Sequence, residues 1–201
     1  MESLIQSLGL PLLGFALCAL LLLLSLKVFP LWSLLYFPER YGLKRKRLPY
    51  PTGSLAVLTF VLLFPFLSEA TSQFWGIFAA VAILGTYSFI DDRTPLPAWL
   101  RIVVQVTVAI LIFATGSRIY TLTNPWGDIG FGELIKLDTI DIPTSGFGPL
   151  PLWSGVFTVL WLGLTINALN WFDGIPGQVS TLSVLGFGTI GLLSLSSRVD
   201  Q

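Results

Sequence analysis

The sequence predicts an all-α integral membrane protein, a polytopic bundle of about six transmembrane helices. The first observation is composition: 54% of the 201 residues are hydrophobic, 11% are charged, and the mean hydropathy is +0.81. Soluble domains carry roughly 25% charged residues, so this chain has too few polar side chains to cover a surface that faces water. The second observation is that apolar runs near the roughly 20 residues needed to cross a bilayer recur along the chain.

Six segments are predicted as transmembrane helices. No basic stretch precedes the first one, so we expect it to stay in the protein as a helix rather than to act as a cleaved signal peptide. A single Cys, Cys18, lies within it and excludes an intrachain disulfide. The predicted helices are Leu8–Leu26, Ser54–Leu67, Phe74–Ile90, Trp99–Thr115, Leu152–Leu169 and Val179–Leu195.

The longest polar connection, residues 116–151, is rich in Gly, Pro, Asp and Thr. Within it, Ile119–Leu122 and Leu137–Ile142 alternate in the way that favours short strands. We therefore expect a short β-hairpin-like loop outside the bilayer. Residues 1–201 are expected to form a single transmembrane domain that carries this extracytoplasmic loop.

The distribution of Lys and Arg predicts the orientation, because basic residues gather on the cytoplasmic side of a membrane protein. Alternate connections between six spans share a side. One side receives Lys27, Arg40, Lys44, Arg45, Lys46, Arg47, Arg93 and Arg101, and the other receives Arg118, Lys136 and Arg198. The first side is predicted to be cytoplasmic, which places the N-terminus and the long polar loop outside.

Three acidic residues fall on the predicted cytoplasmic side at helix ends: Asp91, Asp92 and Asp173. An acid at the bilayer centre costs about 2.5–3.5 kcal/mol, and this cost falls toward the interface. Carboxylates beside cations at the inner interface suit a metal-assisted reaction between anionic substrates. The alternative for the adjacent pair is structural, since an Asp there could cap the helix that starts near Pro97.

The segment Asn167–Gly174 places Asn167, Asn170 and Asp173 three residues apart, along one face of a helix. Amide and carboxylate oxygens suit a hard cation such as Mg²⁺. The alternative is that Asn170 and Asp173 simply end the helix, with Gly174 as its C-terminal cap.

The basic run Lys44–Arg47 precedes Pro49–Ser54. It is interpreted either as a phosphate-binding segment, with Gly53 and Ser54 allowing close backbone approach, or as a consequence of orientation and contact with anionic lipid. The chain contains no His, which excludes His-based acid–base chemistry and His metal sites within it.

Together, Ser88–Asp92, Arg101 and Gln105 on the next helix, and Asn167–Gly174 resemble the polyprenyl-phosphate N-acetylhexosamine-1-phosphate transferases. This family includes the phospho-N-acetylmuramoyl-pentapeptide translocase of peptidoglycan synthesis and enzymes that load N-acetylglucosamine 1-phosphate onto undecaprenyl phosphate. The resemblance covers nearly the whole chain.

The resemblance implies a Mg²⁺-dependent transfer, with Mn²⁺ as the alternative ion, from a UDP-N-acetylhexosamine to undecaprenyl phosphate in a bacterial inner membrane. It implies catalytic roles for Asp91 and Asp92 and a metal site at Asn170 and Asp173. Substrate contacts are implied for Lys46, Gln105 and Asn167. Membrane lipid and a second copy of the chain are further expected partners, and nucleic acid is not.

The sequence departs from the family pattern in two ways. Pro176 stands where the family has a second acid, and the chain ends at Gln201, before the family's Gly-Asp-x-Gly-Ser segment and His-rich loop. We therefore expect an N-terminal fragment of a longer enzyme. The alternatives are an inactive truncated relative and an ion-coupled transporter.

Overall fold

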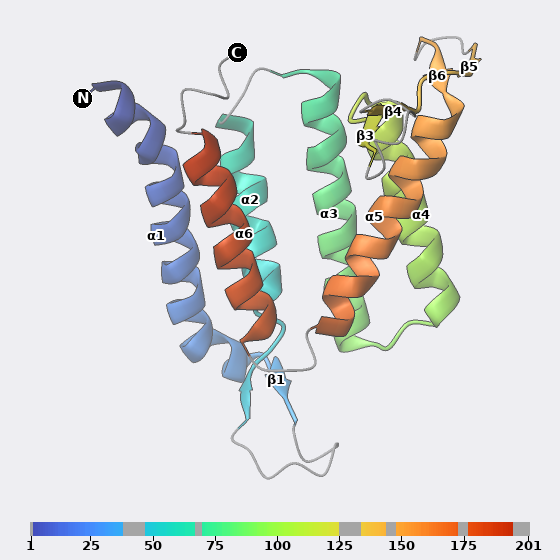
Figure 1. Cartoon of the computed structure of the whole chain (residues 1–201). Helices are drawn as coiled ribbons and strands as arrows, with labels where there is room; N and C mark the ends of the chain where they lie inside the picture. The colour runs from blue at the N-terminus through green and yellow to red at the C-terminus, as the bar shows by residue number, and fades with distance from the viewer. Residues whose placement is uncertain are drawn as a thin grey trace.

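The computed structural model describes residues 2–37, 47–66, 70–124, 134–143, 148–172 and 177–194. Within these ranges the chain folds into upright helices that stand side by side (Figure 1). Their bounds are Glu2–Leu31 (α1), Gly53–Leu63 (α2), Ser72–Arg93 (α3), Ala98–Ala114 (α4), Leu152–Phe172 (α5) and Gln178–Ser194 (α6). The predicted helical membrane fold is confirmed, and each of the six predicted helices is present.

Three of the helical segments are long and apolar enough to cross a membrane: Gly9–Leu31, Ser72–Arg93 and Leu152–Phe172. The others are shorter apolar helices. One of these, α2, is lengthened by a single 3₁₀ turn, Phe64–Phe66, so its apolar stretch runs from Gly53 to Phe66. Helices suit this environment because each satisfies its own backbone hydrogen bonds where no water is available. The protein is a multi-pass membrane protein.

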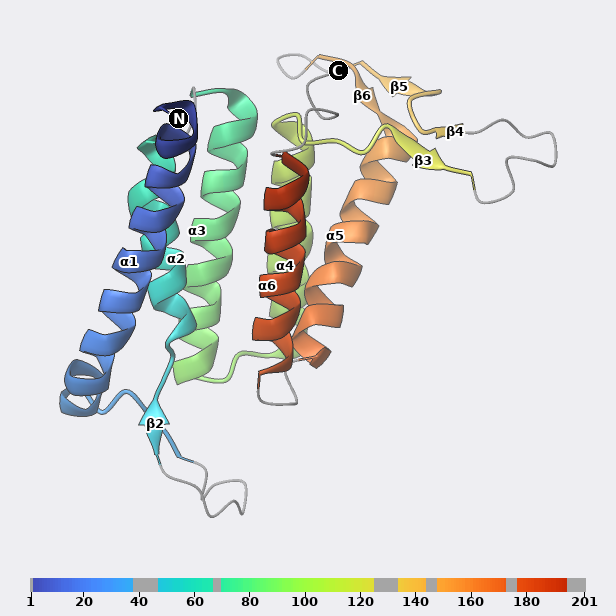
Figure 2. The same ribbon diagram turned by 60° about the vertical axis from the view of Figure 1, so that its left-hand side comes forward.

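Each helix from α1 to α5 packs against the next one in the sequence (Figures 1 and 2). Helix α6 contacts α5 only sparsely, and most of its described side chains are exposed. Small residues allow two of these contacts to be close. A Cβ atom on Gly85 of α3 would clash with Cγ1 of Val57 on α2, and one on Gly76 would clash with Oγ1 of Thr115, at the end of α4. Small residues at such positions let helix backbones approach in a membrane.

Few side chains are buried within the described bundle, and most large apolar side chains point outward. Phe74, Ala80, Val108 and Ala109 belong to its buried core, whereas Phe187 on α6 is 76% exposed. In a bilayer this outward apolar surface faces lipid tails, which are as apolar as the side chains themselves. The bundle is therefore held by contacts between neighbouring helices rather than by one central core.

Short strands lie between α4 and α5, at the end of the bundle where α1 begins (Figures 1 and 2). Thr121–Thr123 (β3) pairs antiparallel with Leu134–Lys136 (β4), and Asp141–Ile142 (β5) pairs with Leu150–Pro151 (β6). Strands were expected in this loop, but the partners differ from a single hairpin. Each expected segment pairs with a different strand, because the loop folds back twice before α5 begins.

A third strand pair lies at the opposite end and was not predicted. Leu35–Tyr36 (β1) pairs antiparallel with Leu48–Pro49 (β2). These strands are two residues long, too short to give an alternating pattern in the sequence. We call the segment from β1 to β2 the basic hairpin, because the run Lys44–Arg47 belongs to it.

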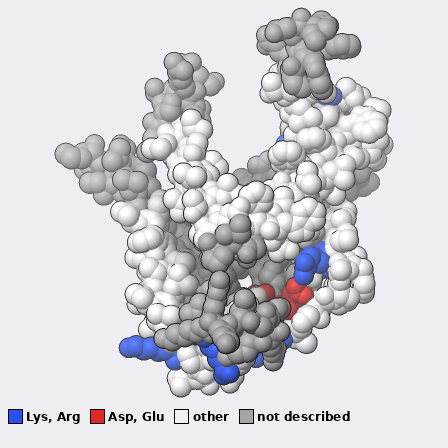
Figure 3. Space-filling view, turned by 60° about the horizontal axis from the view of Figure 1, so that its bottom comes forward, with Lys and Arg blue, Asp and Glu red and all other residues white. Residues whose placement is uncertain are grey.

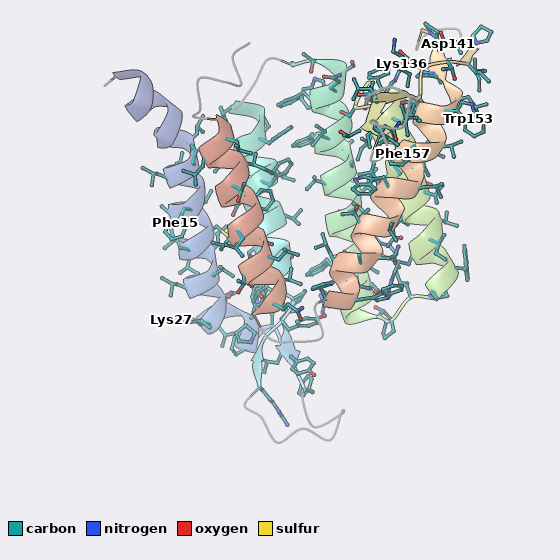
Figure 4. All side chains as sticks on the ribbon, in the orientation of Figure 1. Phe15, Lys27, Lys136, Asp141, Trp153 and Phe157 are labelled. Atoms are coloured by element: carbon teal, nitrogen blue, oxygen red, sulfur yellow. The ribbon has the colours of Figure 1, made fainter. Side chains whose placement is uncertain are left out.

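The charges sort between the two ends as predicted for the described residues. Lys27 lies at the end with the basic hairpin, whereas Lys136 and Asp141 lie at the end with the long loop (Figure 4). Asp91, Asp92 and Arg93 close α3 at the end with Lys27. The carboxylate pair and the basic hairpin therefore share one end of the bundle, as the sequence predicted; we call it the basic end.

Candidate active site at the basic end

The basic end gathers the C-terminal ends of α3 and α5, the N-terminal ends of α2, α4 and α6, and the strands β1 and β2 (Figure 1). Seen from this end, a small acidic area with basic groups beside it lies in a hollow of the surface (Figure 3). Among the described residues, the acids at this end are Asp91 and Asp92. Although adjacent in sequence, these two carboxylates have different surroundings.

Asp91 fastens the turn between α3 and α4. Its Oδ2 atom forms an ion pair with Nη2 of Arg101 at 2.9 Å, and its Oδ1 atom accepts the backbone N–H of Leu96 at 2.8 Å. Both oxygens are thus engaged, and the side chain is only 19% exposed. The helix cap expected as the structural alternative is not formed, because the N-cap of α4 is Pro97 with no side-chain bond. Asp91 instead stabilises the turn that precedes α4.

Asp92 faces a pocket instead. Its Oδ1 atom accepts the hydroxyl of Tyr50 at 2.5 Å. The pocket has a volume of about 320 Å³ and lies between α2 and α3. Its polar lining comes from Ser54, Ser88 and Asp92, and the remaining lining residues are Gly53, Val57, Val81, Leu84, Gly85 and Phe89. Asp92 is thus the one carboxylate among the described residues that line it, at the end of a largely apolar space.

Gln105 and Asn167 were each predicted to contact substrate, and the structure brings them together. Nδ2 of Asn167 donates to Oε1 of Gln105 at 2.7 Å and to the carbonyl oxygen of Gly163 at 2.8 Å. Gln105 is 6% exposed. Because a buried amide without a partner is costly, this bond holds α4 against α5. Gln105 lies one turn beyond Arg101, so α4 carries the partners of both Asp91 and Asn167.

The remaining predicted residues are placed less fully. Asn170 lies in the last turn of α5 and is exposed. Asp173 and Lys46 lie outside the described residues. Among the described residues no hydrogen bond or ion pair joins Asp92 to Asn167 or Asn170, and no three Asp, Glu, Cys or His side chains gather to hold a metal ion. The donors present, carboxylate and amide oxygens, are nevertheless of the type that Mg²⁺ prefers.

Sequence reasoning missed Tyr50. An exposed aromatic residue beside a basic run is ordinary at a membrane interface, where Tyr is enriched. The sequence placed Tyr50 and Asp92 on the same side of the membrane, but 42 residues separate them and no pattern links them. Their contact depends on the position that Tyr50 takes between β2 and the N-terminal end of α2.

The chain belongs to glycosyl transferase family 4, because the model of that family matches residues 74–200, more than half of its length. This region contains nearly all of α3 and the whole of α4, α5 and α6, and with them Asp91, Asp92, Gln105 and Asn167. The family resemblance drawn from these residues is confirmed.

Curated relatives carry two kinds of name. A phospho-N-acetylmuramoyl-pentapeptide-transferase of Listeria monocytogenes serotype 4b is 29% identical over 148 residues, covering 69% of this chain and 41% of the relative. A probable undecaprenyl-phosphate N-acetylglucosaminyl 1-phosphate transferase of Bacillus subtilis is 32% identical over 116 residues, covering 58% of this chain and 27% of the relative. The chain thus spans 41% or less of the length of these two relatives. No solved structure matches it significantly.

Proposed function

We propose that the protein transfers an N-acetylhexosamine 1-phosphate from a UDP-sugar to a polyprenyl phosphate, undecaprenyl phosphate in a bacterial inner membrane. The product would be a lipid-linked diphosphate sugar for cell-wall or surface polysaccharide synthesis. The observation that carries this proposal is Asp92, a carboxylate that lines the α2–α3 pocket at the basic end of a family member. The names of the relatives support the same acceptor and sugar class.

The reaction exchanges one phosphoanhydride bond for another. An oxygen of the lipid phosphate attacks the sugar-proximal phosphorus of the donor, the bond from that phosphorus to the oxygen of UMP breaks, and UMP leaves with the bonding electron pair. Asp92 would position the lipid phosphate and accept its proton, which makes that phosphate a better nucleophile. Asp91 is committed to Arg101 and Leu96, so its role would be to hold the end of α3 that carries Asp92.

The hydrogen-bonded side chains of Gln105 and Asn167 would act indirectly, by holding α5 in place. Their bond joins α4 to α5, and Asn170 follows Asn167 by three residues on the same face of α5. Holding α5 in place would therefore orient Asn170 toward the reacting groups. Lys46, on the basic hairpin, is proposed to contact the diphosphate of the donor, since a Lys ammonium is a point charge suited to phosphate.

A divalent cation belongs to this proposal, because both reactants are anions. Mg²⁺ or Mn²⁺ would be held by Asn170 and Asp173, the oxygen donors at the end of α5. When bound, the ion would neutralise the diphosphate and the charge that develops on it during transfer. The test is removal of the metal: EDTA should abolish transfer, and added Mg²⁺ should restore it.

A transporter would place its carboxylates along a path through the bilayer. Asp91 and Asp92 instead both lie in the last turn of α3, and Asp92 lines the pocket and contacts Tyr50 of the basic hairpin. This placement favours transfer at the cytoplasmic interface, where a lipid acceptor and a water-soluble nucleotide sugar can meet.

The experiment is an exchange assay with the purified full-length protein. Radiolabelled UMP should be incorporated into the UDP-sugar only when undecaprenyl phosphate and Mg²⁺ are present. UDP-N-acetylglucosamine and UDP-N-acetylmuramoyl-pentapeptide serve as separate donors, to identify the sugar. Asp92→Asn should lower the exchange rate by about 10²-fold or more, the scale of a lost general base. The proposal fails if neither donor supports exchange, or if Asp92→Asn leaves the rate unchanged.

A further inference from the structure

Tyr50 connects the basic hairpin to the carboxylate that faces the pocket. It follows β2 directly, and its hydroxyl donates to Oδ1 of Asp92 at 2.5 Å. A hydrogen bond to a charged acceptor is shorter and stronger than one between neutral groups. Among the described residues, Tyr50 provides the hydrogen bond that Asp92 receives.

The hairpin holds Tyr50 in the position needed for this bond. The backbone N–H of Tyr50 donates to the carbonyl oxygen of Leu34 at 3.0 Å, and its ring lies beside that of Tyr36 with the centroids 6.0 Å apart. Pro51, the next residue, is buried. Because the strand pairing has already restricted this side chain, little further freedom is lost when the hydroxyl meets Asp92.

The two carboxylates differ in the charge of their partner. Arg101 offsets the negative charge of Asp91, whereas the hydroxyl of Tyr50 is neutral and leaves the charge on Asp92. The bond to Tyr50 also engages only Oδ1. The second oxygen of Asp92 receives no hydrogen bond from a described residue. Tyr50 therefore orients Asp92 without consuming the charge that the proposed chemistry needs.

We propose that Tyr50 is a positioning residue: its hydroxyl, presented by the basic hairpin, holds the Asp92 carboxylate in one orientation in the lining of the α2–α3 pocket. This inference rests on the proposed function, because it assigns to Tyr50 a role in the same reaction. The basic hairpin would then have a role in the reaction, through Tyr50, in addition to orienting the protein in the membrane.

The test removes only the hydroxyl. Tyr50→Phe should lower kcat by about 10- to 100-fold, the scale expected when a charged group loses a hydrogen bond that fixes its position. KM for both substrates should stay within about twofold, because Asp92 keeps its charge and the pocket keeps its shape. Thermal unfolding in detergent should be unchanged. Tyr120→Phe, the same change at the opposite end of the bundle, is the matched control and should leave kcat unaltered.

Tyr50→Leu separates the hydroxyl from the ring. If the hydroxyl positions Asp92, the two Tyr50 variants lose similar fractions of kcat. If Tyr50→Phe keeps wild-type kcat while Tyr50→Leu loses it, the ring matters through packing and the inference is overturned. A marked fall in the unfolding temperature of Tyr50→Phe would also overturn it, since the role would then be structural. Absence of transfer by the wild-type protein counts instead against the proposed function.

Discussion

Two adjacent residues with the same side chain have different surroundings in this protein. Asp91 is tied by two bonds to the turn and to α4, and Asp92 faces a pocket with a neutral hydroxyl as its partner. Successive residues on a helix point about 100° apart, so only one of the pair can face α2 while the other faces the connection to α4. The site is thus organised at the scale of single side chains by the rotation of α3.

The link between Asp91 and Arg101 is testable by a double-mutant cycle. Asp91→Ala should lower the free energy of unfolding by about 1–2 kcal/mol, because it also leaves the Leu96 N–H without its partner. Arg101→Ala should cost about 0.5 kcal/mol, since its side chain is 38% exposed and water screens the pair.

The measurement is the unfolding of each variant and of the double variant in detergent. The double variant should lose less than the sum of the two, because the shared ion pair is lost only once. Asp138→Ala, at the opposite end of the bundle, is the control and should be neutral. Full additivity would show that the two side chains do not interact.

At the scale of elements, glycine decides how closely the helices approach. Gly76 and Gly85 both lie on α3, and each meets a side chain of a neighbouring helix or of its end. Other glycines in α1 and α6, such as Gly9 and Gly186, have no neighbouring atom within 4 Å of the place that a Cβ would take. Glycine in an apolar helix is therefore a sign of close packing only where a partner helix is actually present.

Gly76→Ala should destabilise the contact between α3 and the end of α4. The added methyl group would clash with Oγ1 of Thr115 and lie 2.6 Å from its Cβ, so one backbone must move. Such overpacking costs about 1–3 kcal/mol. The thermal unfolding of the purified protein measures this.

Gly186→Ala is the matched control, and it should be neutral or slightly stabilising because Ala favours a helix by up to about 1 kcal/mol. Equal stability of the two variants would contradict the close approach of α3 and α4.

At the scale of the whole molecule, the two ends of the bundle differ in charge and in structure. The basic hairpin and the candidate site occupy one end, and the strands β3 to β6 occupy the other. The excess of Lys and Arg at the first end predicts that it faces the cytoplasm. Under the proposed function, Asp92 would then lie on the side of the membrane where nucleotide sugars are present.

Thiol labelling of intact cells tests this orientation. In a Cys18→Ser background, Lys136→Cys should react with a membrane-impermeant reagent added outside, because Lys136 lies on the exposed strand β4. Lys27→Cys, at the basic end, should react only after the membrane is permeabilised. The reverse labelling pattern would place the candidate site outside the cell, where cytosolic substrates could not reach it.

The sequence by itself determined the membrane class, the six helices and the end at which the carboxylates lie. Long apolar runs have few stable structures in lipid, and basic residues mark one side of the membrane, so both features follow from local composition. The pairing of the loop strands could not be predicted from the sequence, since strands of two or three residues carry almost no periodic signal.

Only the tertiary structure decided which partner each polar side chain meets. Tyr50 lies 42 residues from Asp92, and Gln105 lies 62 residues from Asn167. Such contacts depend on the rotation of each helix about its axis and on how closely its glycines let it approach the next. The rotation and the approach of a helix are set by its packing against neighbouring helices. They cannot be deduced from the sequence of one helix alone. The family motif therefore located the candidate site, and the packing of α2, α3 and α4 gave its two carboxylates their different surroundings.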